Sequence, residues 1–519
     1  MRRIKQKKLI ELINVIDRGM EDVSCSSGPS EIMQNVINEY LTAFKTVEGA
    51  VLADFSENKQ KEYQNISGMI INDFMKIISL LSDGNAYASD IKKAVSEIRS
   101  GLAKMQQKLA QEDEIQYLLL FLPYKVSMWD SMESVWLAAC KDPRCTVFVA
   151  PIPYFDRKPD GTFGDLHYEG GQMPGYVDVV DCTQLNLEQL MPDIIYFHNP
   201  YDEHNYVTSV HPAFYSRELK KYTELLVYLF YFVPGAYDSA QSAAVSFQTT
   251  GMWNADLIAA QSKVHKELMT ANGNPPEKIA VLGNPKLDYV LNHLDECQIP
   301  EAWKNKLCGR TVFLVCNSVG TFLGDKNIIE QYDALLEWLI CTCRAAVIYR
   351  PHPLLESTIK TMRPWMYDRY LELLQKYLNS DYFILDNLED FMPSVSASSC
   401  MISDYSSMCF SYAVTGKPVA ISSWNGLPPN DEYYYAFDYR GIDFIALSGG
   451  TADGGVSKSL ADFAQRVIDG EDSGKERRME LIRKSVVNLD GTSGEKIHAY
   501  AVGCLERDEI GNIDEGCAL

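Results

Sequence analysis

The sequence has no apolar run long enough to cross a bilayer, which takes about 20 residues in a helix. Its best runs, Tyr117 to Pro123 and Leu225 to Pro234, are too short. Polar residues also interrupt the apolar positions that follow the basic start of the chain, so this start predicts an amphipathic segment and not a signal-peptide core. We therefore expect a cytoplasmic protein.

Paired cysteine motifs, internal repeats and an excess of positive charge are also lacking. The 13 cysteines are scattered, with neither a zinc-ribbon nor a disulfide spacing, which indicates reduced thiols. With 70 acidic and 48 basic residues the net charge is -22, and such a surface repels a polyanion. Nucleic acid is thus excluded as a main partner, and a phosphate-bearing ligand must be bound by local donors.

Residues 1 to about 113 carry apolar residues at three-to-four spacing, which predicts an N-terminal helical extension of three or four segments. The segments run from Lys5 to Ile16, Glu31 to Phe44, Tyr63 to Leu81 and Ser89 to Gln111. Packing or dimerisation is the simpler role. A second hypothesis, compatible with the first, is that five cations in the first eight residues hold the N-terminal helix on the inner face of the cell membrane.

From about residue 114 short apolar runs alternate with helical segments, which predicts parallel sheets with helices on both faces. Strand-like runs in the first half are 115–122, 145–151, 192–200 and 225–234, and 278–290 ends that half. In the second half they are 311–318, 345–353, 382–386, 400–402 and 418–421, with helices at 327–341, 364–378 and 460–469. We expect an α/β fold with two doubly wound Rossmann-like domains facing a cleft, where ligands bind at the carboxyl ends of strands.

The stretch from Ile402 to Val419 predicts a strand, a turn, a helix and a second strand. Ser403, Asp404, Ser406 and Ser407 supply hydroxyls and a carboxylate where the helix begins. Backbone N–H groups at such a turn are free to bind an anion. The turn is therefore a predicted phosphate site, while ordinary helix capping by the serines is an alternative that does not exclude it.

The segment YRPHP, Tyr349 to Pro353, supplies the complementary cation. Arg350 is permanently charged and can hold phosphate oxygens bidentately. His352 stabilises charge on a leaving phosphate when it is protonated, since phosphates raise a histidine pKa above about 6.5. The alternative for His352 is a buried histidine held by a turn between two prolines.

Three motifs in this order, GNPKLD (Gly283 to Asp288), RPHP and SDYSS (Ser403 to Ser407), resemble the CDP-glycerol glycerophosphotransferase family, the teichoic acid polymerases and primases of GT-B fold. The resemblance covers roughly residues 115 to 505. It implies transfer of glycerol phosphate, or a related alditol phosphate, from a CDP-activated donor to a cell-surface glycan or lipid-linked acceptor. We infer neither a metal nor a cofactor.

The resemblance also assigns residues. His352, Ser403, Ser406 and Ser407 handle the donor pyrophosphate, and Arg350 and Asp404 fix the loops. Further cleft positions are Gly235, Gly283, Asn284 and Asp288. The chain then divides into a helical extension (1–113), an acceptor domain (114–295), a nucleotide-donor domain (296–505) and a tail (506–519).

One position departs from the family pattern. The family usually has a histidine followed by glycine near a strand end of the N-terminal domain, and that histidine is the favoured base. Here Pro234 precedes Gly235. His198, at the end of a predicted strand, is the first substitute, although a strand-end histidine without catalytic role is the simpler interpretation. Other substitutes nearby are Asp202, Glu203, His204 and His211.

Acidic residues also follow the first predicted strand. Asp130 and Glu133 lie between Trp129 and Trp136 at a predicted cleft edge, where they could face the acceptor, or the tryptophans could simply pack in the core.

Three functions stay open: the alditol phosphate transferase, a GT-B glycosyltransferase that uses a nucleotide sugar, and a donor-binding protein that has lost turnover. Pro234 motivates the third.

Overall fold

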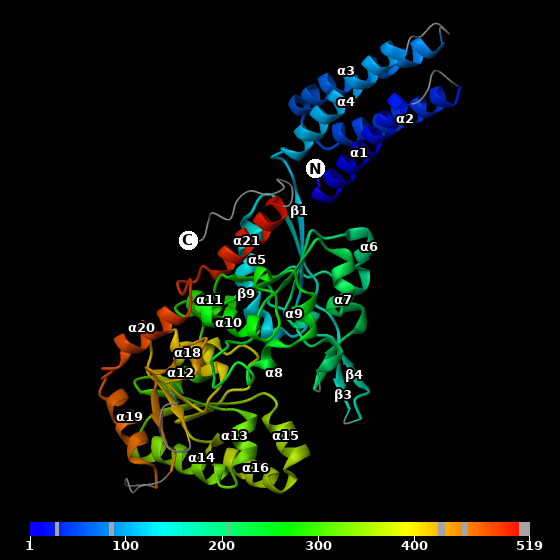
Figure 1. The fold of residues 1–519 in the computed structure, drawn as a ribbon. Coiled ribbons are helices and arrows are strands. Elements are labelled where there is room, and N and C mark those ends of the chain that lie inside the picture. The colour runs from blue at the N-terminus through cyan, green and yellow to red at the C-terminus, as the bar shows by residue number, and fades with distance from the viewer. Residues whose placement is uncertain are drawn as a thin grey trace.

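The computed structural model describes residues 1–25, 31–82, 88–158, 160–205, 207–423, 431–448 and 455–507. Two parallel sheets form the body, and a bundle of long helices projects from one end of it (Figure 1). Most of the predicted tail, from residue 508 on, lies outside the described residues.

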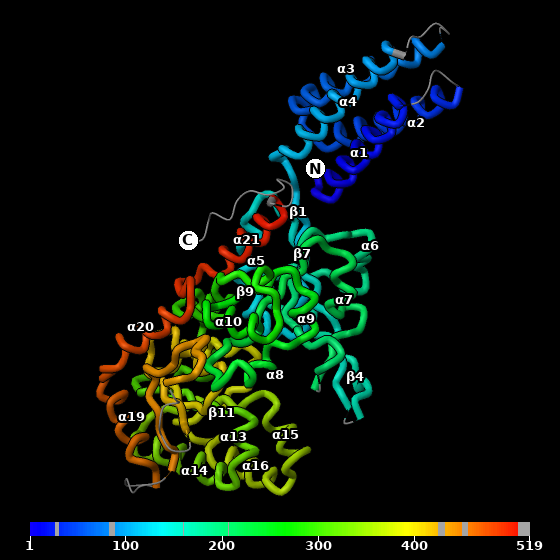
Figure 2. The backbone as a smooth tube through the Cα atoms, viewed as in Figure 1, coloured from blue at the N-terminus to red at the C-terminus, as the bar shows by residue number. Residues whose placement is uncertain are grey.

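The N-terminal bundle is built from long amphipathic helices. They are α1 (Arg3–Cys25), α2 (Glu31–Leu52), α3 (Glu57–Ser82) and α4 (Ala88–Ala110). Ile13, Phe44, Phe74 and Leu102 are each fully buried where these helices meet. All four helices were predicted from the sequence, but several of the predicted helices begin too late or end too early, because apolar periodicity marks the packed face and not the helix ends. Figure 2 follows the chain from the bundle into the body.

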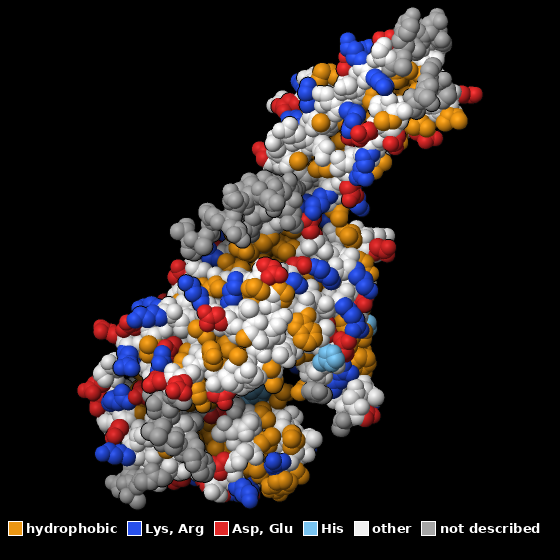
Figure 3. All heavy atoms as spheres, viewed as in Figure 1, with side chains coloured by type: hydrophobic (Ala, Val, Ile, Leu, Met, Phe, Trp, Pro, Cys, Tyr) orange, Lys and Arg blue, Asp and Glu red, His pale blue; other side chains and the backbone are white. Residues whose placement is uncertain are grey.

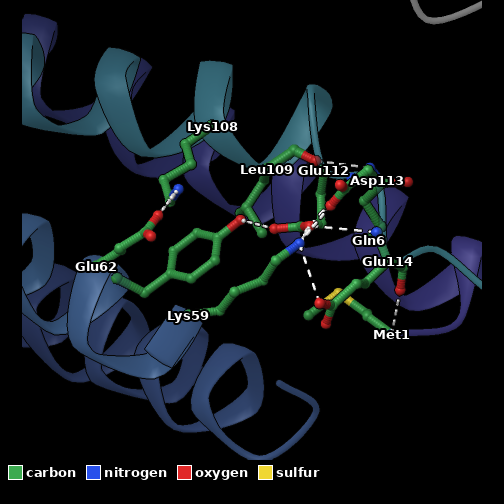
Figure 4. A network of polar contacts seen from close by, with 10 residues as sticks. Met1, Gln6, Lys59, Glu62, Lys108, Leu109, Glu112, Asp113 and Glu114 are labelled. Atoms are coloured by element: carbon green, nitrogen blue, oxygen red, sulfur yellow. Dashed lines mark hydrogen bonds and ion pairs between the residues drawn. The ribbon is translucent and has the colours of Figure 1, made fainter. Parts of the chain in front are cut away.

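A polar network at the root of the bundle joins it to the segment that enters the first sheet (Figure 4). The Met1 ammonium donates to the Glu114 carbonyl oxygen at 2.9 Å. Lys59 on α3 pairs with the Glu112 carboxylate, which also accepts from the Tyr63 hydroxyl at 3.0 Å. These contacts join residues far apart in sequence, so they hold the linker between α4 and β1 against the bundle.

The first sheet has the strand order β10-β9-β7-β5-β1-β2, and every neighbouring pair is parallel. Its strands are β1 (Tyr117–Leu122), β2 (Cys145–Val149), β5 (Ile194–Phe197), β7 (Leu225–Tyr228), β9 (Leu257–Ala260) and β10 (Ile279–Val281). All six residues of β1 are buried, as expected for a central strand covered on both faces. The chain reverses its direction of winding between β1 and β5, which is the switch point of this sheet.

The second sheet has the order β13-β12-β11-β14-β15-β17 and is also parallel throughout. Its strands are β11 (Val312–Asn317), β12 (Ala346–Pro351), β13 (Phe383–Leu385), β14 (Cys400–Ser403), β15 (Val419–Ser422) and β17 (Asp443–Ile445). Numbered along the chain this order is 3-2-1-4-5-6, the dinucleotide-binding arrangement, with its switch point between β11 and β14.

Helices cover both faces of the two sheets. Those of the first domain are α5 (Glu133–Lys141), α6 (Leu187–Leu190), α7 (Ser216–Leu219), α8 (Ala244–Phe247), α9 (Thr250–Asn254), α10 (Lys263–Ala271) and α11 (Pro285–His293). Those after it are α12 (Glu301–Leu307), α13 (Val319–Gly324), α14 (Ile328–Glu337), α15 (Leu355–Met362), α16 (Pro364–Leu378), α17 (Met392–Ala397), α18 (Ser407–Ala413), α19 (Lys458–Ile468), α20 (Lys475–Ser485) and α21 (Ser493–Arg507). The predicted α/β fold, with two doubly wound domains and a helical extension, is confirmed.

The sequence pattern did not predict several short antiparallel strand pairs. β3 (Tyr154–Arg157) pairs with β4 (Phe163–His167) and β6 (Thr208–Val210), while β8 (Ala236–Tyr237) pairs with β16 (Tyr434–Tyr435) across the two domains. Two to five residues are too few to show an alternating pattern.

The last helix returns to the first domain. α21 packs on α5, and a Cβ added at Gly494 would lie 2.3 Å from the carbonyl carbon of Ser134, so only glycine allows this approach. The chain therefore crosses between the domains more than once. The division at residues 295 and 296 stays a prediction.

Candidate active site

Asp404 joins the two strand ends at the switch point of the second sheet. Its carboxylate accepts hydrogen bonds from the Ser318 backbone N–H, at 2.8 and 3.0 Å, and from the Ser318 hydroxyl at 2.7 Å. The residue is 1% exposed. A buried carboxylate is stable only with such donors, so Asp404 is placed to fix the loops after β11 and β14 and not to touch a ligand.

Nothing in the sequence alone pointed to Ser318. It follows the buried strand β11 directly, and a polar residue in that position of a doubly wound sheet is the signal that would have found it.

The serines of SDYSS differ in accessibility. Ser403 is 1% exposed and is not placed to touch a ligand in this conformation. Ser406 occupies the N-cap position of α18, but its side chain makes no capping hydrogen bond. Ser406 and Ser407 are both partly exposed. Ordinary capping therefore does not use the Ser406 hydroxyl, which leaves it available to a phosphate.

His352 is exposed at the carboxyl end of β12, and the turn that holds it uses one ring nitrogen. Nδ1 accepts a hydrogen bond from the Leu354 N–H at 3.1 Å. The neutral ring therefore carries its proton on Nε2 and offers a donor there. Partial desolvation lowers the pKa of His352 from its ordinary value, against the opposing charge of Asp404. Without a ligand these surroundings favour the neutral ring, and the protonation of His352 beside bound phosphates stays a prediction.

Arg350 has its donors engaged within the chain. The guanidinium pairs with the fully buried Asp386 carboxylate at 2.7 Å and donates to the carbonyl oxygens of Glu389 at 3.2 Å and Asp390 at 3.4 Å. These contacts hold the loop after β13. The bidentate phosphate contact that we predicted for Arg350 would require breaking them, so the loop-fixing role fits the structure better.

The GNPKLD motif lies where the two domains meet. Gly283 has φ +103°, and a Cβ there would lie 2.2 Å from the Ser493 hydroxyl. Asn284 caps α11 and donates to Gln261 Oε1 at 3.0 Å. Asp288 is fully buried and accepts from the Gly494 N–H at 2.7 Å; burial raises its pKa to about 6. Gly283, Asn284 and Asp288 therefore make packing contacts where the two domains meet. They do not line an open cleft, although we had expected them to.

Gly235 lies against the SDYSS loop. The Tyr405 hydroxyl accepts from the Ala236 N–H at 3.0 Å, and a Cβ added at Gly235 would lie 2.5 Å from that hydroxyl oxygen and from the Phe410 ring. The segment with Pro234 in place of a histidine is therefore a contact between the domains.

The structure does not support His198 as the acceptor base. The ring is fully buried, Nε2 accepts from the Tyr124 N–H at 3.2 Å, and Nδ1 lies 3.0 Å from the Ser131 hydroxyl. Burial lowers its pKa to about 3. Because both nitrogens are engaged, His198 holds the switch point of the first sheet and cannot reach a hydroxyl from solvent.

The substitutes for His198 also fit structural roles or lie on the surface. The Asp202 carboxylate accepts from the Ser216 N–H and hydroxyl, the latter at 2.6 Å. His211 accepts from the Ala213 N–H. His204 is exposed and Glu203 pairs with Arg217.

A pocket of 250 Å³ lies between the lobes, at the carboxyl edges of both sheets. Its lining includes Trp129, Asp130, Tyr176, Tyr289, Glu389 and Asp390. Asp130 follows β1 in a short 3-10 helix, η1 (Val126–Ser131), and pairs with Lys286 of α11. The expectation that Asp130 lies at a cleft edge is thus met, while Trp129, 2% exposed, also packs against Trp136.

Beside this pocket His293 of α11 and Glu133 of α5 form a contact at 2.6 Å between Nε2 and a carboxylate oxygen. That hydrogen bond raises the pKa of His293. A raised histidine pKa stabilises the fold below the ordinary value of about 6.5, and this contribution is lost as pH rises through the folded-state value. We expect His293→Gln to lower the melting temperature at about pH 6 and to have a smaller effect at about pH 9.

Thermal melts of both proteins across that pH range measure this contribution. The surface variant His204→Gln serves as the control and should show no such dependence. An equal decrease for His293→Gln at both ends of the range would contradict a pH-dependent pair.

One cluster among the described residues has metal-ligand chemistry: Asp142, Cys145 and His498. Asp142 is already bound by the Arg144 guanidinium at 2.8 and 3.0 Å and by His498 at 3.1 Å. A cation so close to the carboxylate disfavours a metal ion. These residues fit a link between α21 and the edge of the first sheet.

On the face in Figure 3, Lys and Arg are interspersed with Asp and Glu rather than gathered in a basic patch. No helix within the described ranges has both the length and the apolar character needed to cross a membrane. No disulfide joins any of the cysteines that the structure describes.

Comparisons with known proteins give one family match. Residues 246–499, just under half of the 519-residue chain, match the model of CDP-glycerol:poly(glycerophosphate) glycerophosphotransferase. No curated protein sequence matches.

Solved structures with a similar arrangement include the wall teichoic acid polymerase TagF, 14% identical over 85% of this chain and 99% of that one, with a TM-score of 0.47. A putative UDP-N-acetylglucosamine 2-epimerase from Listeria monocytogenes is 15% identical over 76% of this chain and 97% of its own, with a TM-score of 0.48. Residues 246–499, which contain His352 and the SDYSS loop, are thus similar to the CDP-glycerol:poly(glycerophosphate) glycerophosphotransferase family.

Proposed function

We propose that this protein transfers glycerol phosphate from CDP-glycerol to a hydroxyl of a poly(glycerophosphate) or glycan acceptor, with release of CMP. The family match over residues 246–499 is the observation that carries the proposal. This region contains the RPHP and SDYSS loops at the carboxyl ends of β12 and β14, where a doubly wound sheet binds its ligand.

The donor loops have the chemistry for a pyrophosphate. His352 offers Nε2–H, and the partly exposed Ser406 and Ser407 offer hydroxyls. Two buried contacts fix these loops: Asp404 accepts a hydrogen bond from Ser318, and Arg350 pairs with Asp386. In the transition state, the donors can stabilise the charge that develops on the leaving phosphate of CMP.

A donor-binding protein without turnover is the second candidate. It is favoured by Pro234 before Gly235 and by the buried, fully engaged ring of His198. Neither supplies a base for the acceptor hydroxyl.

Purified full-length protein incubated with CDP-glycerol, CDP-ribitol and UDP-sugars separates the functions. CMP release from a CDP-alditol, increased by a short oligo(glycerol phosphate), is the expected result. UDP release would indicate a glycosyltransferase and refute the proposal. Binding of CDP-glycerol with no release from any donor would favour the second candidate.

A lipid-linked acceptor and a place on the inner face of the membrane remain hypotheses of the same proposal. Of the basic residues that motivated membrane contact, Arg2 donates to backbone carbonyl oxygens, and Arg3 and Lys7 share one carboxylate of the first domain. Lys5 also forms an ion pair, while Lys8 is exposed. Most of this charge is engaged within the chain, so membrane contact would need another surface as well.

A further inference from the structure

The transferase proposed above lacks a base for its acceptor hydroxyl, and the pocket between the lobes offers one. We propose that Asp130 is the general base that removes the proton from the acceptor hydroxyl, and that the pocket around it binds the terminal polyol unit of the acceptor. This inference rests on the proposed function and names the acceptor half of that same site.

Asp130 has one carboxylate oxygen engaged and one without a partner. Oδ2 pairs with the Lys286 ammonium, whereas Oδ1 is buried with no hydrogen-bond partner among the described residues. Leaving a buried polar atom unpaired is unfavourable, so the site is stabilised when a ligand hydroxyl donates to Oδ1. This separates Asp130 from His198, which is also buried but has both ring nitrogens engaged and does not line the pocket.

The rest of the lining suits a polyol better than a pyrophosphate. Tyr176, Tyr289 and Trp129 present aromatic surface, against which the C–H groups of a polyol or sugar pack. The exposed carboxylates of Glu389 and Asp390 accept hydroxyl hydrogen bonds but repel a diphosphate. A volume of 250 Å³ admits one such unit and leaves the remainder of an acceptor chain outside.

The pocket and the donor motif share a loop. Glu389, Asp390 and Phe391 form the wall that the second domain contributes, and the carbonyl oxygens of the first two accept from the Arg350 guanidinium. The Lys286 ammonium, paired with Asp130, lies 5.3 Å from the centre of the Phe391 ring. Arg350 therefore links the RPHP motif to the acceptor pocket.

The reaction step follows from these positions. The acceptor hydroxyl oxygen attacks the phosphorus of the glycerol phosphate group and forms a new O–P bond. The bond from that phosphorus to the bridging oxygen breaks, and its electron pair leaves with CMP. The proton of the hydroxyl passes to the Asp130 carboxylate.

The surroundings of Asp130 favour a strong base. Burial raises its pKa, and the neighbouring carboxylates of Glu133 on α5 and Asp390 act in the same direction. Lys286 on α11 acts in the opposite direction and favours the ionised carboxylate. The other titratable groups that line the pocket are Glu389, Tyr176 and Tyr289. A carboxylate with a raised pKa that is still ionised is a better proton acceptor than an exposed one.

Asp130→Asn is expected to lower CMP release from CDP-glycerol, with a short oligo(glycerol phosphate) as acceptor, by roughly 10²–10⁴-fold. Its calorimetric affinity for CDP-glycerol should stay within about threefold of wild type, because the donor loops are untouched. Asp130→Glu should recover part of the rate. Asp256→Asn is the matched control, since Asp256 also pairs with a lysine but precedes β9 at the opposite edge of the same sheet.

A second variant covers the case in which Asp130→Asn does not fold. Lys286→Met retains the carboxylate and removes the cation beside it, so the acidic limb of the kcat profile should move to higher pH. Wild-type turnover by Asp130→Asn, or an acidic limb that does not move in Lys286→Met, would overturn this inference but not the proposed function. A wild-type protein that releases no CMP from CDP-glycerol would instead refute the proposed function.

Discussion

Replacing His352 with alanine is expected to lower CMP release from CDP-glycerol by roughly 10²–10³-fold, the loss found when one preorganised donor to a developing charge is removed. The Nε2–H of His352 is exposed at the end of β12, and its orientation is fixed by the hydrogen bond from Leu354 to Nδ1. Because partial desolvation lowers the pKa of His352 and so favours the neutral ring, donor affinity should fall less than turnover. Steady-state kinetics together with calorimetric titration with CDP-glycerol measure the two effects separately.

Two variants sharpen this test. His352→Gln keeps an N–H donor near the Nε2 position but cannot become a cation, so a partial rate would show that hydrogen bonding supplies part of the effect. His167→Ala is the control, because His167 lies on β4 and pairs with Asp156, apart from both switch points. If His352→Ala retained both the affinity and the turnover of wild type, the donor site would have to lie elsewhere.

Much of the fold could be predicted from the sequence because buried parallel strands are continuous apolar runs. Helix α16 begins and ends at the predicted residues, since Pro364 suits a first helical turn. β9 and β17 were not predicted, because each has only three or four residues and lacks a distinctive pattern. The return of α21 to α5 depends on a contact between Gly494 and Ser134, and no local pattern announces a contact so distant in sequence.

The candidate site was predicted less completely. The loops at the ends of β12 and β14 were found because polar residues follow apolar runs there. The residue types alone did not predict the role of each residue in these loops. Arg350 and Asp404 carry charges suited to a ligand, yet each is engaged by a partner, Asp386 or Ser318, that only the tertiary structure brings near. His198 ends a strand as predicted, but its depth in the fold removes it from solvent.

Asp404→Asn is expected to destabilise the second domain by about 2–3 kcal/mol, because the amide cannot accept all three hydrogen bonds that the carboxylate accepts from Ser318. For a domain of this size that loss corresponds to a decrease in melting temperature of roughly 5–10 °C. The loops after β11 and β14 should separate, so affinity for CDP-glycerol should fall as well. Differential scanning calorimetry and titration with CDP-glycerol measure both.

Ser318→Ala removes only the hydroxyl and leaves the backbone donor, so a smaller loss of about 1 kcal/mol is expected. The double variant should then be less destabilised than the sum of the two, since both changes act on one set of bonds. Asp443→Asn is the control: its carboxylate pairs with Arg466 at 2.7 Å but is 30% exposed, and such pairs contribute less than about 1 kcal/mol. Additive losses, or an Asp404→Asn protein that melts and binds donor like wild type, would show that the switch point is held by other contacts.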